Sequence, residues 1–251
     1  MTSDFEPQPE RSQTTSDDWR REVVWGPREI IIGLVLGVVA LLCIEVVAVI
    51  VARLLGVDVK NTTHADQVAL VASVPFELML FVIALSLTVG SRGAKLRSLG
   101  FRPLPLNLVW VTPAAVVGAL SILLVYEGIA NAIGGSRLLP QSNLKGDVLN
   151  QTAFVVMASV LALVLAPLVE ETFFRGFLFG GLTRRFSFVI AALMSGFLFA
   201  LAHGEPTVFI PFTFVGMVFA ASYAYTGSLW TTISAHFLFN LISFIATLAN
   251  R

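Results

Sequence analysis

Seven long apolar runs constrain what this chain can fold into more than any other feature. Each is close to the ~20 residues that a helix needs to cross the hydrocarbon core of a bilayer. Because lipid offers no water to an unpaired backbone group, runs of this length must be helical. The sequence therefore predicts an all-α, polytopic transmembrane helix bundle of seven spans, or eight if a long run is broken. The runs lie near residues 29–52, 68–89, 106–133, 151–182, 187–203, 208–226 and 229–249.

Composition excludes several classes of protein. Of the 251 residues, 56% are hydrophobic and 13% are charged, with 16 basic and 16 acidic side chains. Soluble domains carry about 25% charged residues. An ordinary soluble enzyme, a disordered chain and a basic nucleic-acid-binding protein are therefore excluded. We expect the lipid bilayer as a partner and no nucleic acid. The single cysteine, Cys43, cannot form an intramolecular disulfide.

The N-terminus differs from the rest of the chain in composition. Residues 1–28 are rich in Pro, Ser, Thr, Gln and charged residues, which predicts a disordered tail. The first apolar run begins only at Glu29, so we expect no cleaved signal peptide. The predicted organisation is therefore a tail over residues 1–28 and one transmembrane domain over residues 29–251.

Lysine and arginine residues between the apolar runs predict the orientation. Their number alternates as four, two, four and two along the first polar segments. We therefore expect an integral protein of the plasma membrane with a cytoplasmic N-terminus. The loops at 90–105 and 183–187 are expected on the same side, and seven spans would place the C-terminus outside. The basic residues are Arg11, Arg20, Arg21 and Arg28, then Arg53 and Lys60, then Arg92, Lys95, Arg97 and Arg102, then Arg137 and Lys145, and finally Arg184 and Arg185.

Three glutamates lie inside apolar runs of the N-terminal half: Glu45, Glu77 and Glu127. An ionisable group in lipid is costly and is a functional candidate by default. The simpler interpretation, which we favour, is a protonated or hydrogen-bonded carboxyl group that ties helices together. The alternative is proton transport through the first two of these residues. His64 lies in a polar loop and Glu205 in a short loop, and we assign chemistry to neither.

The apolar run with the most charge contains APLVEETFFRG, with Glu170, Glu171 and Arg175. Residues four apart share a helix face, so we expect Glu171 to pair with Arg175. Glu170 is rotated by about 100° from its neighbour and points elsewhere. A free carboxylate in an apolar pocket is suited to general acid–base catalysis. A buried ion-pair network is an equally good interpretation of this stretch alone.

Three further polar residues follow in the next helices. His203 ends the run FALAH, just before Gly204 and Pro206, where a histidine more often forms a hydrogen bond at a helix end than catalyses a reaction. His236 and Asn240 are four residues apart in HFLFN and face the same way. Interhelical hydrogen bonds are the simpler interpretation of that pair. Together with the two glutamates, however, these residues place titratable groups on three helices of the bundle within 71 residues, as a membrane active site requires.

The motifs resemble those of a known family. EETFFR follows the pattern EExxxR, FALAH follows FxxxH and HFLFN follows HxxxN. In this order and at this spacing they resemble the CPBP family of intramembrane proteases, which includes the Rce1-like type II CAAX prenyl endopeptidases and the bacterial Abi proteins. All three motifs match without departure and span residues 170–240. The first 150 residues contain only a generic membrane signal.

The resemblance implies hydrolysis of a peptide bond in or near the membrane. By motif position, Glu170 would activate the attacking water, and Glu171, paired with Arg175, would support the site. His203 would help to hold that water or a metal. The histidine and asparagine of HxxxN would stabilise the oxyanion, or that histidine would be a second metal ligand.

A metal-dependent and a metal-free mechanism both fit these residues. A catalytic zinc site has three protein ligands and an open position for water, and Glu170, His203 and His236 could bind zinc or another divalent ion. There is, however, no HExxH motif, and the two histidines come from different helices. Without a metal, Glu170 is the base, while His236 and Asn240 donate to the oxyanion, each donor being worth about 100- to 1,000-fold in rate. We favour the metal-free mechanism, with zinc or another divalent metal as the alternative cofactor.

The sequence therefore predicts an endopeptidase that acts on a membrane-associated substrate through a glutamate-activated water. The substrate would be a CAAX-type prenylated C-terminus or another peptide. One alternative is a non-enzymatic membrane protein of the bacteriocin-immunity or scaffold type, with the motifs as a polar core. Another is a proton-coupled transporter, although the chain lacks the repeated halves that many transporters have.

Overall fold

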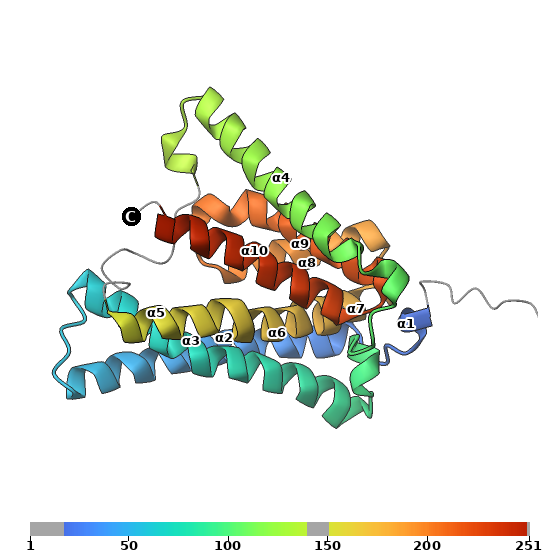
Figure 1. Cartoon of the computed structure of the whole chain (residues 1–251). Coiled ribbons are helices and arrows are strands. Elements are labelled where there is room, and N and C mark those ends of the chain that lie inside the picture. The colour runs from blue at the N-terminus through green and yellow to red at the C-terminus, as the bar shows by residue number, and fades with distance from the viewer. Residues whose placement is uncertain (1–17, 140–150, 250–251) are drawn as a thin grey trace, which may run out of the picture.

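The computed structural model describes residues 18–139 and 151–249, and within these ranges the chain is helical and contains no strand (Figure 1). The expected all-α fold is confirmed. The α-helices are α1 (Asp18–Arg21), α2 (Pro27–Leu54), α3 (Thr62–Leu85), α4 (Val111–Ala132), α5 (Thr152–Val160), α6 (Ala166–Glu170), α7 (Gly180–Leu182), α8 (Phe188–Ala202), α9 (Phe209–Thr226) and α10 (Leu229–Ala249). The π-helices are η1 (Ser86–Gly90), η6 (Leu161–Leu165) and η7 (Glu171–Phe179). The short 3-10 helices are η2 (Leu96–Leu99), η3 (Leu106–Leu108), η4 (Ser136–Leu138) and η8 (Pro206–Val208).

Each of the seven apolar runs forms a helix of the bundle. In the described part of the chain, six of these helices are long and apolar enough to cross a membrane. The seventh, α8, has 15 residues, which makes it about 22 Å long at 1.5 Å per residue. The long run 152–182 is a single helical path in which α5, η6, α6, η7 and α7 follow one another without a loop. The seven predicted spans therefore correspond to six long helices and the shorter α8 among the described residues.

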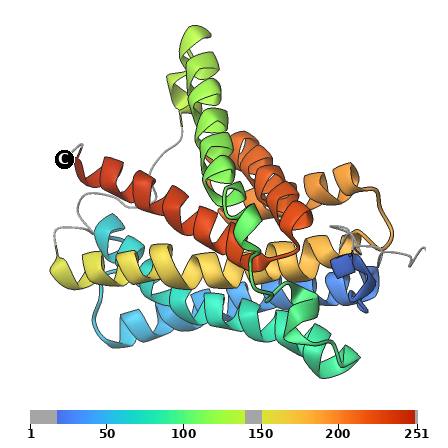
Figure 2. The same cartoon turned by 45° about the vertical axis from the view of Figure 1, so that its right-hand side comes forward.

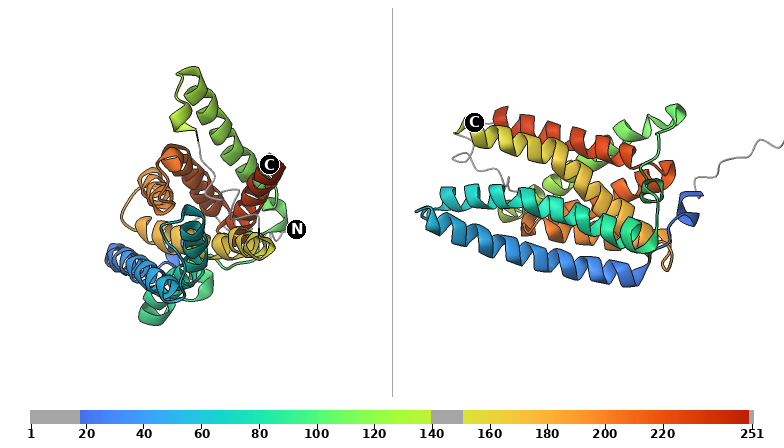
Figure 3. Two further views of the ribbon diagram at one scale, coloured as in Figure 1. Left: turned by 90° about the vertical axis from the view of Figure 1, so that its left-hand side faces the viewer. Right: turned by 90° about the horizontal axis from the view of Figure 1, so that it is seen from below.

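Successive helices run back and forth, so that α1 and the end of α10 lie at opposite ends of the bundle (Figure 1). Helices α2 and α3 pack together, and α3 also packs against α6 and η7. Viewed from below, α2, α3 and the 152–182 path lie side by side (Figure 3, right). Helix α4 contacts α9 and α10 and diverges from the bundle toward its C-terminal end (Figure 2).

Helices α8 and α9 approach closely at two glycines. A Cβ atom on Gly196 would lie 2.3 Å from the carbonyl oxygen of Thr213, and one on Gly216 would lie 2.6 Å from the Cα of Gly196. Small residues at such crossings let the backbones of membrane helices come together. The close approach brings the backbone of α9 within reach of a buried arginine of η7.

The basic loops gather at one end of the bundle. Arg92 pairs with Glu29 at the start of α2, with its Nε atom 3.0 Å from Glu29 Oε1. Arg102 pairs with Glu22 at 2.9 Å, and Arg184 donates a hydrogen bond to the backbone of the N-terminal segment. These contacts bring that segment together with both loops expected on its side, while the side of the membrane that they face stays a prediction. Two of the basic residues counted for orientation lie outside the described residues, namely Arg11 and Lys145.

Residues 18–28 correct the expectation of a disordered tail, whose first 17 residues lie outside the described residues. Trp19 is 2% exposed, its ring centroid lies 4.9 Å from that of Tyr223, and its Nε1 donates to the carbonyl of Ala224. Trp25 is fully buried against the end of the bundle. The polar composition of the segment gave no indication that these two tryptophans are buried, because the surfaces that bury them come from distant parts of the chain.

Candidate active site

The ion pair expected within EExxxR is present. Glu171 and Arg175 lie in η7 with no exposed side-chain surface, and Arg175 Nη1 donates to Glu171 Oε1 at 2.8 Å. The guanidinium also donates to the carbonyl of Gly216 on α9 at 3.3 Å and lies 4.4 Å from the ring of Phe199 on α8. The buried charge is therefore balanced by a carboxylate and an aromatic face. The prediction that the two residues share a helix face is confirmed.

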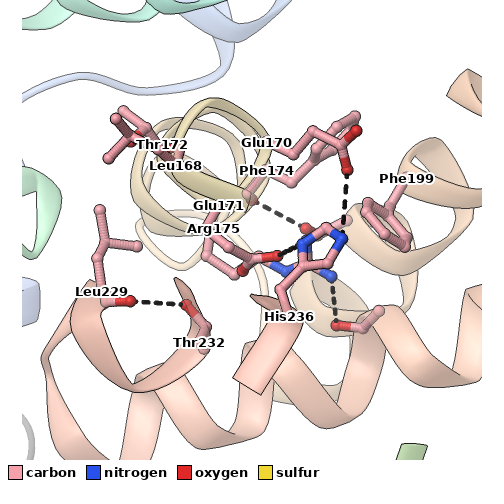
Figure 4. Close-up of polar contacts among 12 residues, drawn as sticks. Leu168, Glu170, Glu171, Thr172, Phe174, Arg175, Phe199, Leu229, Thr232 and His236 are labelled. Carbon is pink, nitrogen blue, oxygen red and sulfur yellow. Dashed lines mark hydrogen bonds and ion pairs between the residues drawn. The ribbon is translucent and has the colours of Figure 1, made fainter. Parts of the chain in front are cut away.

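His236 lies between the two glutamates of the motif (Figure 4). Its Nδ1 is 2.9 Å from Glu171 Oε1, and its Nε2 is 3.9 Å from Glu170 Oε2. A carboxylate only accepts hydrogen bonds, so the bond to Glu171 places a proton on Nδ1 and leaves Nε2 as an acceptor in the neutral ring. The rings of Phe199 and Phe219 pack against the imidazole with centroids at 5.9 and 5.6 Å. The imidazole is thus held at one nitrogen and faces Glu170 with the other.

The helix that holds the glutamates differs from the ordinary α-helix that the sequence predicts, because η7 is a π-helix. A π-helix changes the i to i+4 bonding, and in lipid every backbone group still needs a partner. Two carbonyl groups of η7 accept from side chains elsewhere in the fold. Ser195 Oγ donates to the carbonyl of Phe174 at 2.9 Å, and Trp25 Nε1 donates to that of Phe177 at 2.7 Å. This geometry therefore depends on tertiary contacts that the apolar pattern cannot indicate.

Asn240 of α10 points at the backbone of the neighbouring span. Its Nδ2 donates to the carbonyl of Ala162 in η6 at 2.8 Å. In this π-helical segment each N–H donates to the carbonyl five residues earlier, as the N–H of Ala166 does to Leu161. The carbonyl of Ala162 would accept from residue 167 in the same way, but residue 167 is a proline and has no N–H. Asn240 supplies that donor, and its expected role at the oxyanion stays a prediction.

His203 follows the last residue of α8. Its Nδ1 is 2.8 Å from the carbonyl of Phe199, which places a proton on that nitrogen. Its ring meets those of Phe199 and Phe212 with centroids at 4.6 and 4.8 Å. These contacts agree with a histidine bonded at a helix end. Because Phe199 also packs against His236, one aromatic ring connects the two histidines.

Comparison with known proteins points to the same family. Residues 152–242 match the family model described as type II CAAX prenyl endopeptidase, Rce1-like. The predicted resemblance is confirmed. The Rce1-like region, as residues 152–242 are called from here on, contains all three motifs and runs from α5 into α10.

Two curated relatives align with just over half of the chain. The chain is 28% identical over 140 residues to "Putative membrane peptidase YdiL" of Bacillus subtilis, covering 54% of this chain and 54% of the relative. It is 29% identical over 154 residues to "Membrane-embedded CAAX protease MroQ" of Staphylococcus aureus, covering 56% and 60%. The chain thus spans little more than half the length of either relative, and no solved structure matches it. The family match and the long apolar helices indicate an integral membrane protein.

The three residues predicted as metal ligands are not assembled as a metal site in the Rce1-like region. His203 is bonded to the backbone at Nδ1, and His236 uses its own Nδ1 for Glu171, which leaves Nε2 of each ring available, as in histidines that bind metals. Within residues 18–139 and 151–249, no group of three His, Cys, Asp or Glu side chains is placed to hold a metal ion. The role of Glu170, His203 and His236 as metal ligands therefore stays a prediction.

One residue beside the site lies outside the motifs and outside the Rce1-like region. Glu77 of α3 is buried, and its carboxyl group interacts with that of Glu170. The sequence marks Glu77 as a charge within an apolar run, but no spacing rule connects it to a residue of a different helix. Glu45 and Glu127 are half-buried on α2 and α4.

Two residues that we assigned no chemistry have simple surroundings. Glu205 precedes η8, where its Oε1 accepts a hydrogen bond from the N–H of Thr207 at 3.3 Å. His64 is exposed in the first turn of α3, so the polar loop expected around it is the start of a helix.

An apolar cavity of about 290 Å³ lies between α2, α3, η7 and α8. Its lining includes Phe76, which is next to Glu77, and Phe174, which is four residues after Glu170. Its other lining residues are also apolar, so the cavity fits an apolar group.

Proposed function

We propose that this chain is an intramembrane endopeptidase in which Glu170 is the general base. The single observation behind this proposal is the contact of one imidazole with two glutamates. His236 is held by Glu171 at Nδ1 and faces Glu170 at Nε2. The match of the Rce1-like region supports peptide-bond hydrolysis as the reaction. We favour a glutamate-type mechanism because the described residues assemble no group of three metal ligands.

Glu170 and His236 are spaced to hold one water molecule. The atoms Oε2 and Nε2 are 3.9 Å apart, and both accept hydrogen bonds. An oxygen about 2.8 Å from each, an ordinary hydrogen-bond length, subtends an angle of about 90° between them. This angle is close to the one between the two O–H bonds of water. A water at this position donates to both acceptors and turns its lone pairs toward a substrate carbonyl carbon.

The reaction follows from this position of the water. The water oxygen bonds to the carbonyl carbon, Glu170 takes one of its protons, and the π electrons of the C=O bond move onto the carbonyl oxygen. The tetrahedral intermediate then collapses, the C–N bond breaks, and Glu170 returns the proton to the leaving nitrogen. Glu171 and Arg175 keep the imidazole of His236 in the tautomer that accepts from the water.

The other two motif residues act through position in this proposal. Asn240 donates to the carbonyl of Ala162, which has no helical donor because of Pro167, and so holds α10 against the helix that contains Glu170. His203 packs on Phe199, the ring that contacts both His236 and Arg175. The packing around the imidazole therefore involves every motif.

For the substrate, we propose a membrane-associated peptide, with a CAAX-type prenylated C-terminus as the first candidate. One relative is named a CAAX protease. The apolar cavity of about 290 Å³, which is lined by Phe76 of α3 and Phe174 of η7, supports a substrate with an apolar side chain or lipid group. The basic loops at one end of the bundle support a cytoplasmic N-terminus at the plasma membrane.

The test is cleavage of a peptide panel, prenylated CAAX peptides included, by the detergent-purified protein. We expect Glu170→Gln to lower kcat by about 100- to 10,000-fold, the range of general base catalysis. Glu45→Gln is the matched control, because Glu45 is a half-buried intramembrane carboxyl group of α2. Full cleavage by the Glu170→Gln protein would refute the assignment of the base. If the wild-type protein cleaves no peptide, the scaffold or immunity alternative gains support.

A further inference from the structure

A third carboxyl group lies at the proposed base, on a helix that none of the motifs includes. Glu77 belongs to α3, which packs against α6 and η7, the segments that contain the two motif glutamates. Glu77 is 8% exposed, and among the residues that the structure describes its Oε2 has no hydrogen-bond partner. A buried oxygen without a partner is costly, so its position requires an explanation.

The group that acts on Glu77 is Glu170. Glu170 ends α6, which packs against α3, and its Oε2 is likewise buried without a hydrogen-bond partner in the described part of the chain. The two carboxyl groups also interact through their charge. Two neighbouring carboxylates repel each other in an apolar interior, whereas one proton between them gives a strong, charge-assisted hydrogen bond. A proton on one of the two carboxyl groups therefore explains how both can stay buried.

The surroundings indicate which of the two holds the negative charge. Glu170 lies 3.9 Å from His236 and interacts electrostatically with Arg175, so a negative charge there has partners. Glu77 is the more buried of the two, and among the described residues no ion pair includes it. The charge is therefore better placed on Glu170, with Glu77 as the donor.

We propose that Glu77 is a positioning residue whose carboxyl O–H donates a hydrogen bond to Glu170 and holds that carboxylate beside His236. This inference rests on the proposed function, since it assigns the orientation of the proposed base. A carboxylate fixed from both sides remains aimed at the water, whereas one without this bond can rotate away from Nε2. Helix α3, outside the Rce1-like region, would then contribute to the reaction itself.

Three substitutions of Glu77 test this role. Glu77→Met keeps much of the side-chain volume and removes the donor, and Glu77→Asp keeps the carboxyl group but withdraws it by one methylene. We expect both substitutions to lower kcat by about 10- to 100-fold, the rate factor that corresponds to losing a hydrogen bond to a charged group. The KM should change less than about twofold. Glu77→Gln provides an N–H donor, so its kcat should be at least about tenfold above that of Glu77→Met. The control is Glu127→Met, at the half-buried carboxyl group of α4.

Each outcome bears on one proposal or the other. The measurements use a peptide that the wild-type protein cleaves and Glu170→Gln does not, so the proposed function is established before Glu77 is tested. A wild-type kcat for Glu77→Met or Glu77→Asp would overturn the positioning role and leave the proposed function intact. A Glu77→Gln protein as slow as Glu77→Met would also overturn it. If Glu77→Met does not fold, we still expect Glu77→Asp to be slower than Glu77→Gln, and equal kcat values for these two variants would overturn the role.

Discussion

Helix α2 and the segment 171–182 are both helical parts of one bundle, yet they relate hydrophobicity to burial in opposite ways. Helix α2 is the most apolar of the six long helices, and only 6% of its most apolar 18-residue stretch is buried. In the segment 171–182 every residue is buried, including Glu171 and Arg175. A soluble protein would show charged residues outside and apolar residues inside.

The difference shows which forces hold the two parts in place. The apolar side chains of α2 are satisfied by lipid, which is as apolar as they are, so they gain little from packing. The charges of 171–182 cannot face lipid and must find partners within the protein. Fixed geometry is therefore concentrated in the polar interior, where Glu170, Glu171, Arg175 and His236 lie.

The largest effect that this comparison predicts is that of Arg175→Ala. It leaves Glu171 as a buried charge without its guanidinium partner, and we expect a loss of about 3–5 kcal/mol in the free energy of unfolding. The measurement is reversible unfolding in detergent or mixed micelles. Arg137→Ala, at an exposed arginine after α4, is the control and should change this energy by less than about 0.5 kcal/mol. Equal losses for the two variants would contradict the comparison.

A leucine pair tests the comparison without charges. Leu178 in η7 has no exposed surface, whereas Leu42 on α2 is 61% exposed. We expect Leu178→Ala to cost about 2–5 kcal/mol, because it leaves a cavity among packed side chains. Leu42→Ala should cost about 0.5 kcal/mol or less, because lipid chains adapt to the missing atoms. The same unfolding measurement applies, and a Leu42→Ala loss as large as that of Leu178→Ala would show that α2 is held by packing.

The smallest effect concerns the irregular backbone beside the site. Asn240→Ala should cost about 1 kcal/mol, since it removes the donor to the carbonyl of Ala162. In a Pro167→Ala background the new N–H can donate to that carbonyl, so the same Asn240→Ala change should cost less. A double-mutant cycle measures this coupling. An identical cost in both backgrounds would mean that Asn240 does not compensate for the proline.

Local patterns predicted much of this structure. The Glu171–Arg175 pair follows from the four-residue spacing, and it forms although η7 is a π-helix. The end of α8 next to His203 was predicted from the helix-breaking residues Gly204 and Pro206 that come after it. The CPBP motifs predicted the family resemblance, which the match of residues 152–242 confirms.

Contacts between distant residues were not predictable in this way. Trp19 and Trp25 lie in a polar segment, and their burial depends on surfaces of α9 and η7. The donation of Asn240 to Ala162 depends on how α10 meets the 152–182 path, as well as on Pro167. Glu77 could be marked as an intramembrane charge, but its approach to Glu170 depends on how α3 packs against α6.

The sequence by itself determined the seven apolar helices, the position of the charges along them and the pairing within one helix face. These depend on hydrophobicity and helical period, which act between neighbours in the chain. Only the tertiary structure decided that one imidazole meets two glutamates, that Glu77 joins them and that a π-helix holds the pair. Those features exist because each charge or unpaired carbonyl in lipid must find a partner, and the partners come from helices far apart in sequence.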